Sequence, residues 1–140
     1  MSNNYKTILN LKNTDIALFL LRIGVGGLML THGIPKLINL FDSNPIRFGD
    51  PIGIGMEASL ALTVFSEVIC SIMIIIGLGT RLAAIPLFFT MGVAFFIVHG
   101  ADPFKNKELA LFFMIVYLVL FLTGSGKYSL DQYFLKRKKG

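Results

Sequence analysis

Charged residues are scarce in this chain. Asp, Glu, Lys and Arg make up 15% of its 140 residues, whereas soluble domains carry about 25%. Hydrophobic residues make up 54%. A soluble chain of this length, which is that of a single domain, must cover its surface with polar groups, and this chain has too few. The composition therefore excludes a disordered protein, a nucleic-acid-binding domain and an ordinary soluble enzyme, and it indicates an integral membrane protein.

Cysteine is almost absent as well. Cys70 is the single cysteine of the chain, which excludes an internal disulfide, a CxxC redox pair and a zinc site built from cysteines. The chain cannot carry out dithiol chemistry alone.

Long hydrophobic runs are what the sequence does contain. A membrane-spanning helix needs about 20 mostly apolar residues, and four segments qualify, at about 16–40, 56–78, 82–101 and 109–126. The runs are too long, and alternate too little, for strands of a membrane barrel. The sequence predicts an all-α integral membrane four-helix bundle at 15–126, preceded by a cytoplasmic arm (1–14) and followed by a basic cytoplasmic tail (127–140).

The distribution of cations predicts the topology. Eight Lys and Arg residues fall on one side of the four spans and four on the other: Lys6, Lys12, Arg81, Lys127, Lys136, Arg137, Lys138 and Lys139 against Lys36, Arg47, Lys105 and Lys107. The positive-inside rule then places both termini in the cytoplasm of a bacterial inner membrane. In the tail, Ser129 and Gln132 have capping-box spacing, which predicts a short amphipathic helix against anionic lipid.

Polar residues form a stripe in the second span. Ser59, Thr63, Glu67 and Ser71 recur every four residues, so a regular helix would place them on one slowly turning face. Small hydroxyl residues of this kind are common in helix contacts, but Glu67 lies near mid-membrane, where a carboxyl must be protonated or paired. Arg22 in the first span is its candidate partner; the alternative is that Arg22 extends to the headgroups.

A second group of polar residues is expected at the outer surface. The predicted topology places His32, Lys36, Glu57, His99 and Asp102 at similar depth. They are ordinary interfacial residues, or they form a proton-handling site, a quinone headgroup site or a metal site. No HxxxH or HxxE spacing supports the metal. We therefore take Glu67, His99 and His32 as candidate catalytic residues, and Arg22, Lys36 and Glu57 as candidate cofactor-binding residues.

The chain resembles the DoxX family of small four-helix bacterial membrane proteins. The resemblance extends from about Asp15 to Phe134 and rests on an ordered set of stretches: Leu21–Gly24, His32–Leu37, Phe65–Glu67, Gly77–Ala84, Ala94–His99 and Gly124–Asp131. The family agrees with four spans. Arg22, Glu67, Arg81 and His99 fall on its recurrent polar positions.

The resemblance implies two redox settings. One is quinone-coupled oxidation of sulfur compounds such as thiosulfate, and the other is a membrane complex that maintains thiol balance under oxidative stress. The first hypothesis is therefore a membrane subunit of a redox system, which binds a quinone or a soluble redox partner protein in the lipid bilayer. The second is a small transporter subunit or a non-catalytic membrane assembly protein, and transport through four short helices would require a homo-oligomer. Whether the protein is an enzyme is left open at this stage.

Overall fold

The structure, a computed structural model, describes residues 9–42 and 44–140. Lys6 and most of the expected N-terminal arm lie outside the described residues. The elements, in chain order, are α1 (Leu11–Asp42), α2 (Met56–Val64), the π-helix η1 (Phe65–Cys70), α3 (Ser71–Ile76), α4 (Thr80–Val93), the π-helix η2 (Ala94–Val98), α5 (Phe104–Thr123) and α6 (Leu130–Lys139).

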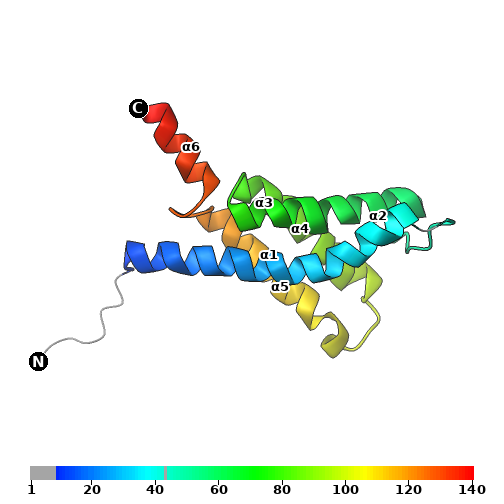
Figure 1. The fold of residues 1–140 in the computed structure, drawn as a ribbon. Helices are drawn as coiled ribbons and strands as arrows, with labels where there is room; N and C mark the ends of the chain where they lie inside the picture. Colours follow the sequence, from blue (N-terminus) through cyan, green and yellow to red (C-terminus); the bar gives the residue numbers. More distant parts are fainter. Residues whose placement is uncertain (1–8, 43) are drawn as a thin grey trace, which may run out of the picture.

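Four continuous helical segments are long and apolar enough to cross a membrane: Leu11–Asp42, Met56–Ile76, Thr80–Val98 and Phe104–Thr123. They confirm the predicted all-α four-helix membrane fold, with ends that differ by a few residues from the predicted ones. Successive segments run in opposite directions, so the start of α1 and all of α6 lie at the same end of the bundle (Figure 1). We call this the terminal end, and the other the opposite end.

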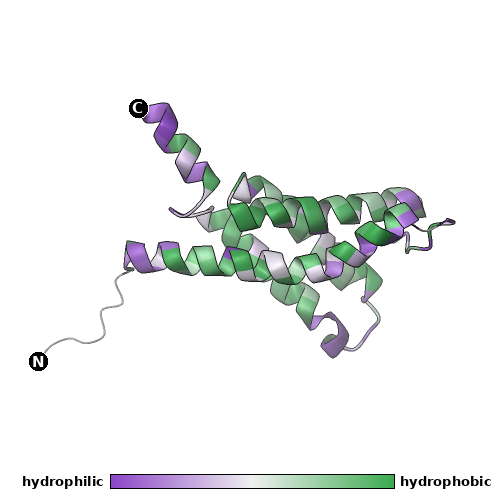
Figure 2. Ribbon diagram, viewed as in Figure 1, coloured by the Kyte–Doolittle hydropathy of each residue, from purple (hydrophilic) through white to green (hydrophobic). Residues whose placement is uncertain are grey.

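Apolar side chains cover the outside of the bundle. Figure 2 shows hydrophobic residues along the middle of the spanning segments and hydrophilic ones at the start of α1, at the end of α6 and around the start of α5. Leu82, Phe89 and Phe96 are 72%, 65% and 68% exposed. Exposed apolar surface on this scale would be unusual on a soluble monomer, whereas a lipid bilayer covers it.

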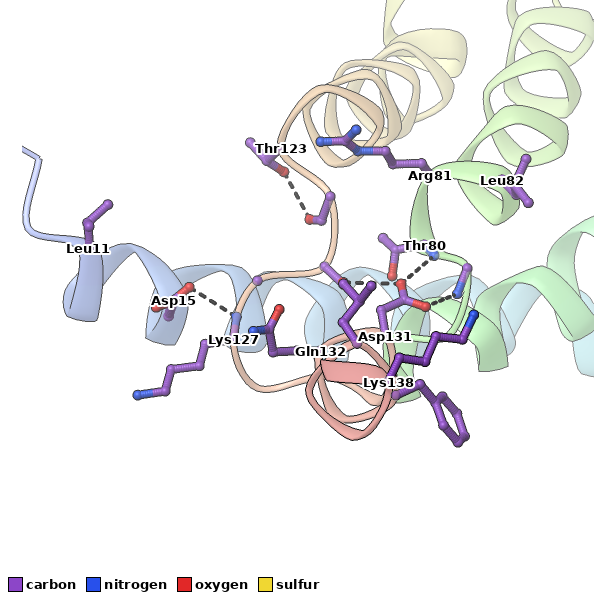
Figure 3. Close-up of a pocket in the computed structure, with 16 residues that line it drawn as sticks. Leu11, Asp15, Thr80, Arg81, Leu82, Thr123, Lys127, Asp131, Gln132 and Lys138 are labelled. Atoms are coloured by element: carbon purple, nitrogen blue, oxygen red, sulfur yellow. Dashed lines mark hydrogen bonds between the residues drawn. The ribbon is translucent and has the colours of Figure 1, made fainter. Parts of the chain in front are cut away.

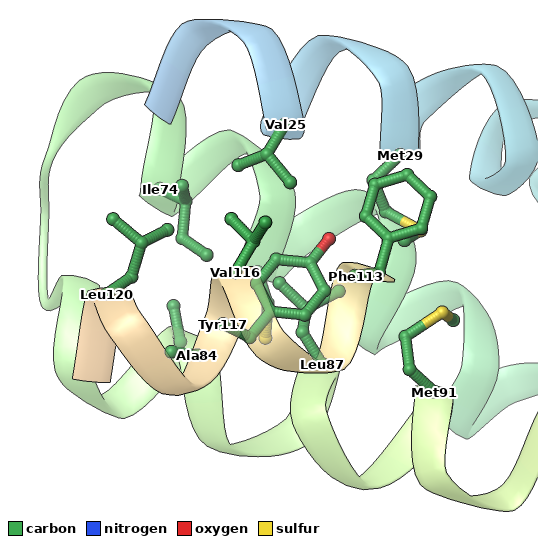
Figure 4. Packing of buried hydrophobic residues seen from close by; sticks show 12 residues of the cluster. Val25, Met29, Ile74, Ala84, Leu87, Met91, Phe113, Val116, Tyr117 and Leu120 are labelled. Atoms are coloured by element: carbon green, nitrogen blue, oxygen red, sulfur yellow. The ribbon is translucent and has the colours of Figure 1, made fainter. Parts of the chain in front are cut away.

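The interior packs around Tyr117 of α5. This side chain is fully buried and stacks on Phe113, one turn earlier, with ring centroids 6.0 Å apart. Residues from α1, α3 and α4 close around the two rings, and in Figure 4 the Tyr117 hydroxyl points toward α1. A smaller cluster, Leu60, Val64 and Val68, packs against the second half of α1. All four spanning segments therefore share one core.

A glycine ends α3 and allows a tight turn into α4. Gly77 has φ +71°, in the left-handed region, and the amides of Gly77 and Leu78 donate to the carbonyls of Ile74 and Met73. This Schellman motif satisfies carbonyls that the helix end leaves free. A Cβ at Gly77 would also collide with the Arg22 side chain and with Ser129.

The tail forms the predicted short helix. The Ser129 hydroxyl caps α6 by accepting a hydrogen bond from the Gln132 amide at 3.2 Å. The Asp131 amide donates to the Gly77 carbonyl at 2.9 Å, which fastens the first turn of α6 to the α3–α4 turn. From there α6 runs obliquely away from the bundle with Tyr133, Phe134 and Leu135 exposed (Figure 1). Its contact with the membrane surface stays a prediction.

Candidate functional site

Lys36 and Glu67 form an ion pair inside the membrane-spanning part of the bundle. The Lys36 ammonium donates to both carboxylate oxygens of Glu67, at 2.6 and 2.7 Å. The Glu67 side chain is 3% exposed, whereas that of Lys36 is 32% exposed. The acidic member of the pair, Glu67, is therefore buried, whereas the basic member, Lys36, is accessible from outside the bundle.

The backbone on both sides is shaped to bring these two groups together. Pro35 lies inside α1, where its missing N–H and its ring disturb the regular hydrogen bonding of a helix. In Figure 1 the last turns of α1 bend toward α2. Glu67 lies on the π-helix η1. Segments of this type are rare in proteins overall, but where they occur they are often part of a functional site.

A close helix contact lies directly behind the pair. Gly33 of α1 is buried against η1, and a Cβ there would lie 2.9 Å from both the carbonyl oxygen of Glu67 and a methyl of Val68. Small residues allow membrane helices to approach in this way. Because Gly33 is almost one turn before Lys36, it sets the distance from which Lys36 reaches Glu67.

The expected ion pair between Arg22 and Glu67 is wrong. Arg22 is fully buried at the terminal end, where its guanidinium donates to the carbonyls of Ile74 (3.3 Å), Ile75 (3.4 Å) and Tyr128. The alternative, extension to the headgroups, is wrong too, because the side chain has no exposed surface. Arg22 instead joins the end of α3 to the segment before α6, a structural role that places it away from the Lys36–Glu67 pair.

The polar residues of the second span do not form one continuous face of the helix. The Ser59 hydroxyl donates to Asp50 in the preceding loop (2.9 Å), and Thr63 donates back to the Ser59 carbonyl (2.7 Å). The residue before Glu67, Ser66, is buried and receives a hydrogen bond from Thr90 of α4 at 2.8 Å. The π-helix changes the angular spacing after Val64, so a pattern of every fourth residue loses its register there.

Two further buried hydroxyls lie in the same part of the interior. Tyr117 of α5 and Ser71, which follows Glu67 by four residues, are both fully buried. Neither hydroxyl finds a hydrogen-bond partner among the described residues. Ser66, Thr90 and Tyr117 were not predicted as site residues, because single hydroxyls in an apolar span carry no sequence signal beyond packing.

The two histidines lie in different surroundings. His32 is exposed and meets Phe113 edge-to-face, with centroids 6.2 Å apart. It precedes Lys36 by one helical turn and shares its face of α1. His99 follows η2 and contacts Asp102 at 2.7 Å. Glu57 is exposed in the first turn of α2, where the helix dipole favours a carboxylate.

The structure therefore divides the predicted outer group. It pairs Lys36 with Glu67, and it places His32 one turn before Lys36 and in contact with Phe113; we call these four residues the pair site. His99, Asp102 and Glu57 form separate contacts. Within residues 9–42 and 44–140, no three His, Cys, Asp or Glu side chains gather closely enough to hold a metal ion. An accessible ammonium and imidazole in front of a buried carboxyl are suited to bind a polar acceptor and to transfer a proton.

Comparison with known proteins gives a consistent result. The DoxX family model matches residues 17–100, a range that includes Lys36, Glu67 and His99. An uncharacterized protein of Haemophilus influenzae is 32% identical over 84% of this chain and 90% of its own length. An uncharacterized membrane protein of Mycobacterium tuberculosis is 29% identical over 84% of this chain and 80% of its own. No solved structure matches the chain.

Proposed function

The chain belongs to the DoxX family, and from that premise we propose that it is a membrane subunit of a redox system that binds a quinone at the pair site. The observation that carries the proposal is the one-sided exposure of the Lys36–Glu67 pair. A pair serving only to hold two helices together needs no accessible side. Here the lysine is one-third exposed, while the carboxylate is almost completely buried.

The residues of the pair site fit a quinone headgroup in their chemistry. The headgroup has carbonyl oxygens that accept hydrogen bonds, and its reduction takes up two electrons and two protons. Lys36 and His32 provide N–H donors one turn apart on α1, and Phe113 provides an aromatic ring beside His32. When bound, the quinone supplies the electron-accepting chemistry, and the protein supplies orientation and protons.

Glu67 is the proton-handling group of this proposal. Lys36 donates to both oxygens of this carboxylate inside the membrane-spanning part of the bundle. If Lys36 turns to hydrogen-bond a ligand, Glu67 loses its partner, and an unpaired carboxylate at this depth favours taking up a proton. Ligand binding and protonation of Glu67 are thereby coupled. The electrons come from a soluble redox partner, because one cysteine cannot act as a dithiol.

The proposed setting is the bacterial inner membrane with both termini in the cytoplasm. The predicted excess of cations supports this orientation, because it lies at the terminal end, which carries Arg81 and the basic α6. A reporter fused after Lys139 tests the topology, and activity of that reporter only outside the cell would contradict it.

Quinone binding is tested on the purified protein in mild detergent. Solvent extraction of the wild type should yield quinone, and a short-chain quinone should bind in a titration. We expect Lys36→Met to weaken this binding by about ten-fold, the effect of one charge-assisted hydrogen bond. Glu67→Gln should not weaken it, because Lys36 then leaves a weaker acceptor when it turns to the quinone. Glu108→Gln, which changes an exposed carboxylate in α5, is the matched control and should bind as the wild type does. Absence of quinone from the extract together with absence of binding would overturn the proposal.

The second candidate is a transporter subunit or a non-catalytic assembly protein, and the contact at Gly33 favours it. The close approach of α1 to the Glu67 carbonyl shows that the pair also joins two tightly packed helices. In that case Glu67→Gln would lower thermal stability, and the wild type would bind no quinone. Quinone binding by the wild type therefore separates the two functions, because the loss of stability in Glu67→Gln is expected in both cases.

A further inference from the structure

A groove lies at the terminal end of the bundle, far along α1 from the pair site. It encloses about 900 Å³ between α6, the start of α1, the start of α4 and the connection at 124–127 (Figure 3). This volume is in the range of small-molecule binding sites. The groove does not depend on the proposed quinone site, which is built on other residues.

The carboxylates of the groove are occupied by the protein itself. Asp131 accepts hydrogen bonds from the Gly79 amide (2.8 Å), the Thr80 amide (3.4 Å) and the Ser125 hydroxyl (3.1 Å). Asp15 accepts from the Lys127 amide at 3.0 Å. These bonds hold α6 and the preceding connection against the bundle. Both carboxylates therefore stabilise the walls of the groove and already have hydrogen-bond donors within the protein.

The cations of the groove are available to a ligand. Arg81, Lys127 and Lys138 line it from three different segments, and all three are exposed (Figure 3). Arg81 uses one nitrogen to donate to the Leu122 carbonyl at 3.4 Å. The Thr80 hydroxyl also belongs to the lining. Thr80 is 1% exposed, and its hydroxyl has no hydrogen-bond partner in the part of the chain that the structure describes.

Apolar side chains form part of the remaining walls, although these walls belong to the polar end of the molecule. Leu11, Leu82, Phe134 and Leu135 line the groove and are exposed, Leu82 to 72%. Leu82 is in the first turn of a spanning segment, where a lipid acyl chain would begin. A soluble phosphate would leave these side chains uncovered, whereas a phospholipid places a charged phosphate beside an apolar chain.

We propose that this groove binds an anionic phospholipid, with its acidic headgroup among Arg81, Lys127, Lys138 and the Thr80 hydroxyl, which surround the groove from different sides, and its acyl chain along Leu82 and Phe134 (Figure 3). Arginine and lysine are the usual phosphate-binding side chains, and basic pockets between membrane helices bind acidic headgroups. The site positions α6, since the same helix contributes Asp131 to the hydrogen bonds that hold it against the bundle and Lys138 to the lipid.

The test is a titration of the full chain in detergent with short-chain phosphatidylglycerol, followed by thermal melting. Bound lipid raises the melting temperature in a concentration-dependent way. Replacing Arg81, Lys127 and Lys138 by Gln should weaken the apparent affinity by at least about ten-fold. The matched control replaces Lys136, Arg137 and Lys139 by Gln, which removes the same charge from residues that do not line the groove, and it should keep most of the affinity.

A second variant covers the case in which the triple replacement impairs folding. Thr80→Val removes a hydroxyl that makes no hydrogen bond to the described residues, so stability without lipid should be unchanged, while affinity falls about five-fold. Equal loss in both triple variants would overturn the proposal, because attraction to the whole tail would explain it. Equal stabilisation by phosphatidylcholine, or by glycerol phosphate alone, would overturn it as well.

Discussion

The Lys36 ammonium binds both carboxylate oxygens of Glu67, and this contact joins the end of α1 to the middle of the second spanning segment. Its geometry leaves the acid covered and the base partly open. The contact therefore contributes to the packing of these two segments, and its loss should be measurable as a loss of stability.

Lys36→Met leaves the buried Glu67 carboxylate without its partner, and Glu67→Gln leaves Lys36 with a weaker neutral acceptor, so each should lower the free energy of unfolding by about 1–3 kcal/mol. The lower part of this range is expected, since the Lys36 side chain is 32% exposed. The double variant should lose less than the sum of the two single losses. Thermal melting in detergent measures the cycle.

The control for this cycle is a pair that the structure separates. Arg22→Leu combined with Glu67→Gln should give additive losses, because Arg22 bonds to backbone carbonyls at the terminal end. Additive losses for Lys36 and Glu67, or coupling between Arg22 and Glu67, would contradict the observed pairing.

Gly33→Ala should destabilise the protein and disturb Glu67. The added methyl would lie 2.9 Å from the Glu67 carbonyl oxygen, so α1 and η1 must move apart, at a cost of about 1–3 kcal/mol. Gly27→Ala is the matched control on the same helix, since an added methyl there meets no described atom within 4 Å. Thermal melting in detergent compares the stability of the two variants. Equal melting temperatures of Gly33→Ala and Gly27→Ala would show that the close approach at Gly33 is not required.

Arg22→Gln should release α6 from the bundle. The shorter amide reaches fewer of the carbonyls of Ile74, Ile75 and Tyr128, and the loss of hydrogen bonds from a buried charged group is expected to cost about 2–3 kcal/mol. Faster amide exchange in residues 128–139 is the measurement. Arg47→Gln, which changes an exposed arginine in the loop before α2, should leave that exchange unchanged. An unchanged exchange rate in Arg22→Gln would show that Arg22 does not hold α6 against the bundle.

The loop before α2 should loosen in acid. Hydrogen bonds from the Gly55 amide, the Ser59 hydroxyl and the Ile54 amide lower the pKa of Asp50 below its ordinary value, although desolvation opposes the shift. A lowered pKa stabilises the loop above the unfolded pKa of about 4, and this contribution is lost as the pH falls through the folded value.

Amide exchange at Ile54 and Gly55 tests this pH dependence. Protection in the wild type, corrected for the intrinsic exchange rate, should fall below about pH 4. In Asp50→Asn the protection should be low at every pH and should not titrate. A wild-type protection that stays constant through this range would contradict the role of the carboxylate.

Several features of the site could be read from the sequence. Ser129 and its capping spacing predicted α6 because a cap depends on neighbours within one turn. Glu67 was recognised because a carboxyl in the middle of an apolar span requires a partner or a proton, whatever the fold. Its partner was predicted incorrectly. Arg22 and Lys36 both lie on the first span, and the choice between them depends on helix phase, on the bend at Pro35 and on the π-helix around Glu67.

The class of this protein follows from its four long apolar runs, because a chain in lipid must satisfy its backbone hydrogen bonds internally and therefore forms helices. Which polar groups meet depends on how these helices pack. Hydrophobic burial has no direction, so it selects helices without fixing their rotation, whereas an ion pair forms within a few ångströms. The close backbone approach at Gly33 brings Lys36 within hydrogen-bonding distance of Glu67. The left-handed turn at Gly77 leaves room for Arg22 to reach the carbonyls at the end of α3.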